Sequence, residues 1–351
     1  MGACYVTSLT PGAESTCPIG ILTERHGTRI LGMAEPLPTF KDVYEFKNLY
    51  DAHMKARRGK RNRREVIDFE LNLGYNLAEL SQLLKDGTYH LQPYTRFVVT
   101  DPKRRVVHAL CYRDRVIQHS LCDNVVGTII DPRLIYDNAA CRKNKGAHFA
   151  LNRLEGFLGS YYKDYGNQGY FLKCDIRHYF ASINHCVLQD KLLRCPFDVR
   201  TREFLGSIIN SYQEDPNKGL PLGNQTSQWF ALYYLDSLDR LIKERLQIKG
   251  YVRYMDDCIL IHHDKYILTQ CLRAMRWHIT ALGLEFNNKT QIAPLKNGID
   301  FLGWHFYLTN TGKVIRKLRQ SAKHRIKRKL KQLEHAEPQY AAMVRTSIKH
   351  T

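Results

Sequence analysis

Two adjacent carboxylates, Asp256 and Asp257, interrupt an otherwise apolar stretch between Val252 and Ile261. The flanking residues alternate and are rich in β-branched side chains, which predicts two strands joined at a tight hairpin that carries the acids in its gap. Two acids at such a tip repel each other unless a cation binds them. Carboxylate oxygens of this kind suit Mg²⁺, which takes a few protein oxygens together with substrate phosphates.

A third acid, Asp175, ends another apolar run about eighty residues upstream. Alone, it could be a helix cap or a surface group, just as a bare Asp-Asp pair could be a solvated turn. Together, two strand-borne carboxylate sites are what two-metal phosphoryl transfer needs. One ion activates a 3′-hydroxyl, and both stabilise the phosphorus and the leaving pyrophosphate.

The charge balance favours a polyanionic partner. The chain has 351 residues, with 53 Lys and Arg against 34 Asp and Glu, a formal net charge of +19. Nucleic acid is the most plausible partner. A membrane surface is weaker, because no run of about 18 apolar residues occurs. The ten cysteines have no zinc-ligand spacing, which predicts reduced thiols in a cytoplasmic protein.

The stretch from Tyr254 to Asp257 resembles the signature of reverse transcriptases, and Asp175 resembles the acid of their first palm motif. The resemblance extends over roughly residues 41–331. It implies an α+β right-hand polymerase, in which fingers, palm and thumb surround the acids. Its expected parts are a poorly ordered leader (1–40), fingers with N-terminal helices (41–160), a palm of antiparallel sheet backed by helices (161–308), and a short, basic helical thumb (309–351).

The same resemblance implies a set of catalytic and metal-binding residues. Two Mg²⁺ ions, with Mn²⁺ as a possible substitute, would be held by Asp175, Ile176, Asp256 and Asp257. Lys289 matches a lysine that may protonate the leaving pyrophosphate, with a plain surface lysine as the alternative.

Residues 94–110 predict a hairpin with a basic turn. In reverse transcriptases the matching hairpin closes over the nucleotide, and Lys103 and Arg105 match the side chains that hold its triphosphate; the alternative is an ordinary solvated turn. Phe180 matches an aromatic ring that lies under the sugar and excludes a 2′-hydroxyl. Its alternative is a core side chain.

A glycine-rich turn at residues 219–228 opens a predicted helix and offers free N–H groups there. Most reverse transcriptases have Gln before Gly223 and Pro after the serine, whereas this chain has Leu222 and Gln228. That departure resembles the reverse transcriptases of diversity-generating retroelements, which copy a template RNA with errors at adenines. Leu222 removes a hydrogen-bonding side chain from the nucleotide pocket, so we expect looser selection there.

Further segments match parts of the family that contact nucleic acid or support the fold. Arg115 and Gln118 lie on a predicted helix (112–121) and are expected to be structural. The template-contacting loop would be formed by Arg142, Lys145 and Gly146, and the primer-grip hairpin by Phe301, Leu302 and Gly303. Other helices are predicted at 66–84, 147–162, 229–246 and 266–282.

Two tracts are densely basic: seven of the ten residues in 55–64, and nine of the sixteen in 316–331, are Lys or Arg. The second tract also has apolar residues at helical spacing, which predicts a helix with one packed face. Both tracts are expected to bind phosphate, a solvated surface being the alternative.

The leading interpretation is a nucleotidyltransferase, an RNA-directed DNA polymerase that makes error-prone cDNA in a diversity-generating retroelement. Its expected partners are template RNA, primer or cDNA, dNTPs and a small basic accessory protein, with no membrane. A defence-associated, anti-phage reverse transcriptase would share this chemistry. A maturase-like RNA-binding protein that does not polymerise is the alternative from another class, although such a binder has no need for paired acids.

Overall fold

A computed structural model describes residues 36–100, 104–212, 214–215 and 217–334. All of these residues except Pro36 belong to the unit that spans residues 37–351. Most of the predicted leader lies outside the described residues, as does Lys103. The fold mixes helices with antiparallel sheets, as the predicted α+β class requires.

The predicted acidic hairpin belongs to a four-stranded antiparallel sheet in the order β4-β5-β3-β6. Its strands are β3 (Tyr170–Cys174), β4 (Gly250–Tyr254), β5 (Asp257–His262) and β6 (Gln291–Pro294). Cys174 faces Cys258 across the β3–β5 pair. This register brings the end of β3 next to the start of β5, which are the two places where the acids occur.

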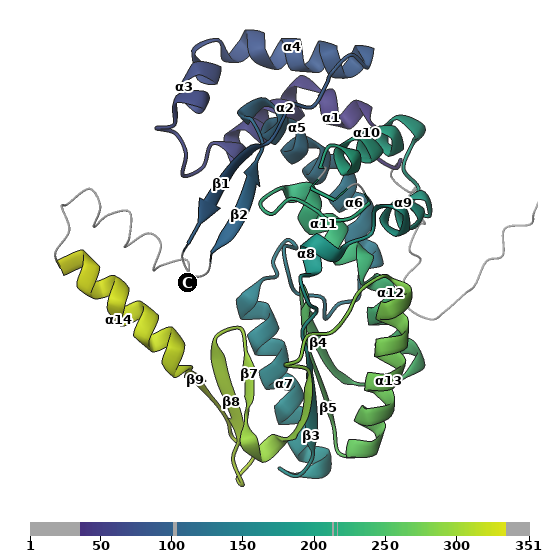
Figure 1. The fold of residues 1–351 in the computed structure, drawn as a ribbon, viewed down its shortest axis with the longest axis vertical. Helices are drawn as coiled ribbons and strands as arrows, with labels where there is room; N and C mark the ends of the chain where they lie inside the picture. The colour runs from purple at the N-terminus through teal and green to yellow at the C-terminus, as the bar shows by residue number, and fades with distance from the viewer. Residues whose placement is uncertain (1–35, 101–103, 213, 216, 335–351) are drawn as a thin grey trace, which may run out of the picture. The chain divides into compact units, whose positions relative to one another are not determined.

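Side chains alternate along these strands, so residues on the two faces of the sheet pack into two separate hydrophobic cores. Phe171, Val252 and Ile259 pack into one core together with residues of α7 (Ala147–Tyr165). Leu172 and Leu260 pack into the other, which includes the inner face of α13 (Lys265–Ala281). The sheet is thus covered on both faces (Figure 1), which explains why its strands are almost continuously apolar.

A second, three-stranded sheet follows, formed by β7 (Ile299–Phe301), β8 (Trp304–Leu308) and β9 (Val314–Leu318). Because β9 pairs with β8, the predicted palm boundary at residue 308 cuts this sheet. The basic helix, α14 (Gln320–Glu334), begins at residue 320 and not at 316 as expected. Its apolar stripe is only partly packed: Ala322 is buried, whereas Leu330 is 46% exposed.

The N-terminal part is a layer of helices from which a hairpin projects (Figure 1). Its elements are α1 (Lys41–Tyr44), α2 (Phe46–Ala56), α3 (Arg64–Leu71), α4 (Leu73–Asp86), β1 (Thr95–Val99), β2 (Arg105–Ala109) and α5 (Tyr112–Leu121). The hairpin and α5 confirm the expectations for those segments. The single helix expected over 66–84 is wrong, because the backbone leaves the helical region at Asn72.

The remaining helices of the described residues are mostly short. They are η1 (Cys122–Val126), α6 (Gly127–Ile130), η2 (Asp131–Arg133), α8 (Tyr179–Ser182), α9 (His185–Leu193), α10 (Val199–Asn210), α11 (Gln225–Tyr234), α12 (Asp236–Arg240), η3 (Leu241–Arg245) and η4 (Leu295–Asn297). The helix predicted over 229–246 therefore begins four residues early, and it is interrupted at Leu235.

Packing does not follow the expected boundary between fingers and palm at residue 160. That boundary would cut α7, which runs on to Tyr165 and packs against β4. Conversely, α10 lies in the range expected for the palm but packs against the N-terminal layer, because the rings of Phe204 and Phe40 lie 5.3 Å apart. Asp198, at the start of α10, also accepts a hydrogen bond of 2.9 Å from the Phe40 amide.

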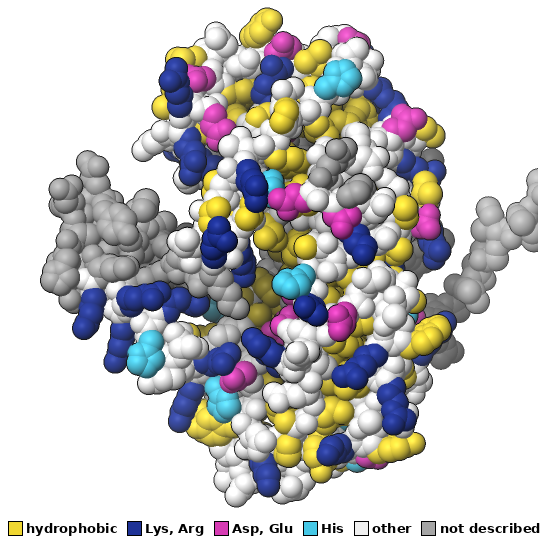
Figure 2. All heavy atoms as spheres, in the orientation of Figure 1, with side chains coloured by type: hydrophobic (Ala, Val, Ile, Leu, Met, Phe, Trp, Pro, Cys, Tyr) yellow, Lys and Arg dark blue, Asp and Glu magenta, His cyan; other side chains and the backbone are white. Residues whose placement is uncertain are grey.

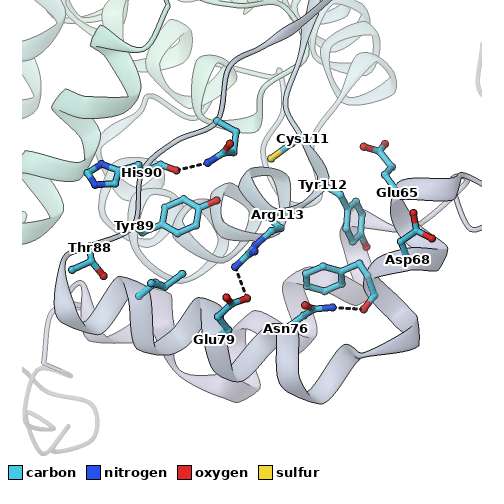
Figure 3. A pocket seen from close by; sticks show the side chains of 13 residues that line it. Glu65, Asp68, Asn76, Glu79, Thr88, Tyr89, His90, Cys111, Tyr112 and Arg113 are labelled. Carbon is cyan, nitrogen blue, oxygen red and sulfur yellow. Dashed lines mark hydrogen bonds and ion pairs between the residues drawn. The ribbon is translucent and has the colours of Figure 1, made fainter.

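A cavity of about 670 Å³ lies among α3, α4 and the start of α5 (Figure 3). Its polar walls are largely paired: Arg113 binds Glu79 at 2.8 Å, and Asn76 donates to the Phe69 carbonyl. No described residue of the predicted site lines it, so we assign it to helix packing. Among the described residues, no helix is long and apolar enough to cross a membrane.

Candidate active site

The acidic hairpin turns through Met255 and Asp256. Tyr254 pairs with Asp257, so Asp257 is the first residue of β5 and only Asp256 lies in the gap. This corrects the expectation that both acids occupy the turn. Met255 has φ +54°, a left-handed conformation that is uncommon for a side chain of its size. The turn therefore needs support from its surroundings.

Asp175 follows β3 directly and is held by a residue that the sequence did not single out, Asn287. The Asn287 side-chain amide donates to Asp175 Oδ2, and its backbone amide donates to the Asp175 carbonyl at 2.8 Å. Only its position two residues before Lys289 could have drawn attention to it. Asn287 fixes one carboxylate oxygen of Asp175.

Burial and the neighbouring carboxyls raise the proton affinity of Asp256 and Asp257. Burial raises the pKa of Asp256 to about 6, and the nearby Asp175 carboxyl adds to that increase. Burial likewise raises the pKa of Asp257 to about 7, against the lowering effect of Lys173 and with further increases from Asp175 and Asp256. Desolvated acids that face one another favour either protons or a cation between them.

The donor set fits a hard divalent cation. Asp257 Oδ1 is buried and has no hydrogen-bond partner, so one oxygen of this acid is left for a ligand. The described residues contain no ready-made cluster of three or more metal-binding side chains. A cation would therefore complete the site together with substrate oxygens, as Mg²⁺ commonly does. Ile176 has a buried, apolar side chain, so only its carbonyl could contribute.

Lys173 is a second residue that the sequence did not single out. Its ammonium lies 3.5 Å from Asp257 Oδ2 and donates to the Asp300 carbonyl in β7 at 2.6 Å. Lys173 therefore places a positive charge beside a metal-binding acid and links that acid to the second sheet. Its position two residues before Asp175, on the same strand face, was the available signal.

On the nucleotide side, Leu222 and Gly223 lie against the β1–β2 hairpin. A cavity of about 470 Å³ is lined by these two residues together with hairpin residues such as Phe97 and Val107. Arg105 starts β2 with an exposed side chain. The structure thus brings two of the predicted pocket residues, Leu222 and Gly223, to one cavity beside the hairpin.

Gln228 does not line the same cavity as Leu222. It lines a larger cavity of about 1110 Å³, whose other walls include Arg58, Lys60 and Lys143. Lys60, Gly223 and Asn224 line both cavities. Gln228 therefore faces a basic cavity, and its predicted place in the nucleotide pocket stays a prediction.

Phe180 and Lys289 lie on either side of the Asp256–Asp257 pair along the chain. Phe180, in α8, is half-buried against the core, and its carbonyl accepts a hydrogen bond of 2.8 Å from the Leu220 amide. This bond joins Phe180 to the 219–228 segment. Lys289 is exposed in a turn, where its amide donates to Asn287 Oδ1 at 2.8 Å. It thus neighbours the residue that holds Asp175.

The predicted template loop has a structural role for its cations. The Arg142 side chain is 7% exposed and binds Asp131 and the Ile135 carbonyl. Lys145 donates to the Tyr136 carbonyl at 2.6 Å, and burial lowers the pKa of its ammonium to about 8. Both cations bind carbonyl or carboxylate groups near the loop itself, and their contact with the template stays a prediction.

The structural expectations for α5 are confirmed. Gln118 is fully buried and accepts a hydrogen bond of 2.9 Å from Thr226 in α11. Arg115 donates to the Leu110 carbonyl at 3.0 Å. The expected primer-grip hairpin is also present, with Leu302 and Gly303 as its two turn residues.

The first basic tract divides into paired and unpaired cations. Lys55 binds Asp123 at 2.8 Å, Arg57 binds Glu70 at 2.6 Å, and Arg64 lies 3.6 Å from Asp68. Three exposed arginines form no ion pair with the described residues; they are Arg58, Arg61 and Arg63. In Figure 2, a further row of basic side chains follows α14. Exposed cations without a carboxylate partner are open to phosphate.

Comparison with known proteins gives one family. The family model "Reverse transcriptase (RNA-dependent DNA polymerase)" matches residues 100–306. The group II intron-encoded protein LtrA of Lactococcus lactis subsp. cremoris is 24% identical over 182 residues, which are 49% of this chain and 28% of that protein. The chain thus matches less than a third of the length of this curated relative.

Two solved structures are also similar. Telomerase from Candida albicans, in complex with the TWJ fragment of telomeric RNA, has a TM-score of 0.47 and 13% identity, covering 65% of this chain and 46% of that one. Apo telomerase from Candida tropicalis, truncated from its C-terminal domain, has a TM-score of 0.47 and 14% identity, covering 69% and 60%.

Proposed function

We propose that this chain, which belongs to the reverse transcriptase family, is an RNA-directed DNA polymerase whose acids Asp175, Asp256 and Asp257 hold Mg²⁺. The observation that carries the proposal is the meeting of these acids, in mutual electrostatic contact, where β3 ends and β5 begins. An RNA-binding protein that does not polymerise has no use for desolvated acids whose pKa values are raised.

The surrounding residues fit the steps of nucleotide addition. When bound, Mg²⁺ lowers the pKa of a primer 3′-hydroxyl and offsets charge on the nucleotide phosphates. Arg105, with Lys103, would hold the triphosphate from the hairpin, and Phe180 would exclude a 2′-hydroxyl. Lys289 would donate a proton to the leaving pyrophosphate. Template RNA, primer and dNTPs are the substrates that this arrangement requires.

The test is primer extension on a homopolymer RNA template with Asp256→Asn and Asp257→Asn variants. Each should abolish dNTP incorporation while RNA binding stays nearly unchanged, because that binding rests on distributed cations. Asp190→Asn is the matched control, since Asp190 is exposed and has no partner among the described residues. Appreciable synthesis by either active-site variant would contradict the assignment. A wild-type protein that binds RNA but never extends a primer would favour the maturase-like alternative.

We further propose that copying is error-prone, as in a diversity-generating retroelement. The support is Leu222, an apolar side chain in the cavity beside the hairpin, at a position where the resemblance to reverse transcriptases leads us to expect Gln. A missing hydrogen bond is worth about 0.5–1.5 kcal/mol, or roughly a two- to twelvefold loss of selectivity. Such a factor tunes an error rate without confining errors to adenines, so other residues must contribute.

Sequencing of the cDNA tests this second proposal. Misincorporation should be highest opposite template adenine, and Leu222→Gln should reduce it by part of that factor. Equal fidelity opposite all four bases would favour a defence-associated role. No change on substitution would move the determinant elsewhere, with Gln228 next to be tested. A small basic accessory protein, proposed from the family resemblance, would be found by co-purification with the chain.

A further inference from the structure

A fully buried cation lies directly behind the acidic turn. Arg253 is 1% exposed and sits in β4, two residues before Met255. Its guanidinium donates to both carboxylate oxygens of Asp239 in α12, at 2.7 and 2.6 Å. Asp239 is itself fully buried. A planar guanidinium in a two-pronged pair of this kind is held in one orientation.

The remaining donors of this guanidinium reach the turn and α11. Arg253 Nη1 donates to the Met255 carbonyl at 2.8 Å, and Nη2 donates to the Leu232 carbonyl at 3.1 Å. The backbone of Arg253 is fixed as well, because its amide donates to the Asp137 carbonyl at 3.1 Å. The guanidinium therefore makes three hydrogen bonds away from the turn, two to Asp239 and one to Leu232. Its fourth hydrogen bond is to the turn that carries Asp256.

This contact acts on the strained part of the turn. Met255 adopts its left-handed φ with no glycine to relieve the cost, and such a conformation persists only where its surroundings hold it. The Met255 carbonyl belongs to the peptide unit that leads into Asp256. A bond to that carbonyl fixes the peptide plane from which the Asp256 side chain departs.

We propose that Arg253 is a positioning residue, which uses Asp239 as its anchor to hold the Met255–Asp256 turn in the conformation that binds the divalent cation. The inference rests on the proposed function, because it assigns metal binding to Asp256. It goes beyond that function because it makes the geometry of the metal site depend on the buried Arg253–Asp239 ion pair, which does not itself bind the metal. Through Leu232, the same cation also contacts the helix that follows the Leu222 segment.

The chain offers a matched control. The Tyr251 hydroxyl donates to Asp239 Oδ1 at 2.6 Å, so Tyr251→Phe removes a bond from the same buried carboxylate without touching the turn. Arg253→Lys keeps the charge opposite Asp239 but cannot span from that carboxylate to the Met255 carbonyl. Both variants should lose stability, and only Arg253→Lys should change the metal site.

The first measurement is Mn²⁺ binding to the protein alone, followed by the electron paramagnetic resonance signal of free Mn²⁺, with Asp256→Asn marking loss of the site. Arg253→Lys should bind Mn²⁺ about tenfold more weakly than wild type, the factor expected for one strong hydrogen bond. Tyr251→Phe should bind as wild type does. The second measurement, the Mg²⁺ concentration at half-maximal primer extension, should rise by a similar factor in Arg253→Lys.

Wild-type Mn²⁺ affinity in Arg253→Lys would overturn the inference, as would an equal loss in Tyr251→Phe. If Asp256→Asn bound as much Mn²⁺ as wild type, there would be no such site to position. Asp239→Glu, which keeps the ion pair but displaces its anchor, replaces Arg253→Lys if that variant does not fold, with the same outcomes. Wild-type protein that binds Mn²⁺ through Asp256 but never extends a primer would overturn the polymerase proposal alone.

Discussion

Replacing Asp257 by Asn should stabilise the metal-free protein at pH 8. The folded protein raises the pKa of Asp257 to about 7, from an ordinary value of 3.8, so folding disfavours the ionised carboxylate. A difference of this size corresponds to about 4 kcal/mol of lost stability above pH 7. Asn removes the charge, while Lys173 keeps its bond to the Asp300 carbonyl. Because Lys173 loses an ionic partner, we expect a net gain of about 2–4 kcal/mol.

The pH dependence has a defined sign. The folded state binds the Asp257 proton more tightly than the unfolded chain does, so wild-type stability falls as pH rises from about 4 to about 7 and is level above that. Between pH 5.5 and pH 8 the fall due to this group is about 2 kcal/mol. Asp257→Asn should lose that part of the pH dependence.

Urea unfolding in the presence of EDTA, at pH 5.5 and pH 8, measures both quantities. Asp190→Asn again serves as the control and should leave the difference between the two pH values unchanged. Adding Mg²⁺ at pH 8 should narrow the gap between wild type and Asp257→Asn, because only wild type gains a bound cation. The reasoning would be refuted if Asp257→Asn were no more stable than wild type at pH 8 in EDTA.

Three further predictions concern substrate choice, metal affinity and RNA binding. Phe180→Ala should raise rNTP relative to dNTP incorporation in primer extension, and an unchanged ratio would make Phe180 a core residue only. Lys173→Met should lower the half-saturating Mg²⁺ concentration about three- to tenfold, because the substitution removes a positive charge from beside the acids. An unchanged concentration would mean that Lys173 only links β3 to β7 and does not affect metal binding. Changing Arg61 and Arg63 together to Gln should flatten the slope of log K for RNA against log salt by about 0.7–0.9 for each phosphate that the protein no longer binds. Arg57→Gln, which removes a guanidinium already paired with a carboxylate, should leave that slope unchanged.

Much of the fold could be predicted because its signals are local. Strand alternation and β-branching located the acidic hairpin and the 94–110 hairpin, since side chains of a strand alternate between faces. The break at Asn72 was missed because apolar residues continue at helical spacing on both sides of it, with no proline to mark an end. The early start of α11 was missed for a related reason: the residues from Gln225 to Gln228 are polar, although they are helical and Thr226 and Ser227 are buried.

The missed site residues depend on contacts between distant parts of the chain. Asn287 holds Asp175 across 112 residues of sequence, and Lys173 reaches the Asp300 carbonyl across 127. Arg142 shows a different limit of sequence patterns, because its ion pair lies within its own loop region. A basic residue near a glycine resembles a phosphate loop, but its partner is a nearby carboxylate in η2. Charge pattern alone does not show whether a cation is already paired.

The two acids of the hairpin are held from opposite faces of one sheet, which follows from the two-residue period of a strand. Lys173 contacts Asp257 on the face that packs toward β7. Arg253 reaches the turn from the other face, where α12 supplies Asp239. A substitution in either core can therefore alter one acid without the other. The two networks also differ in kind: the Arg253–Asp239 pair behind the turn is fully buried, whereas the Lys173–Asp257 pair is partly exposed and places a cation beside the metal-binding acid.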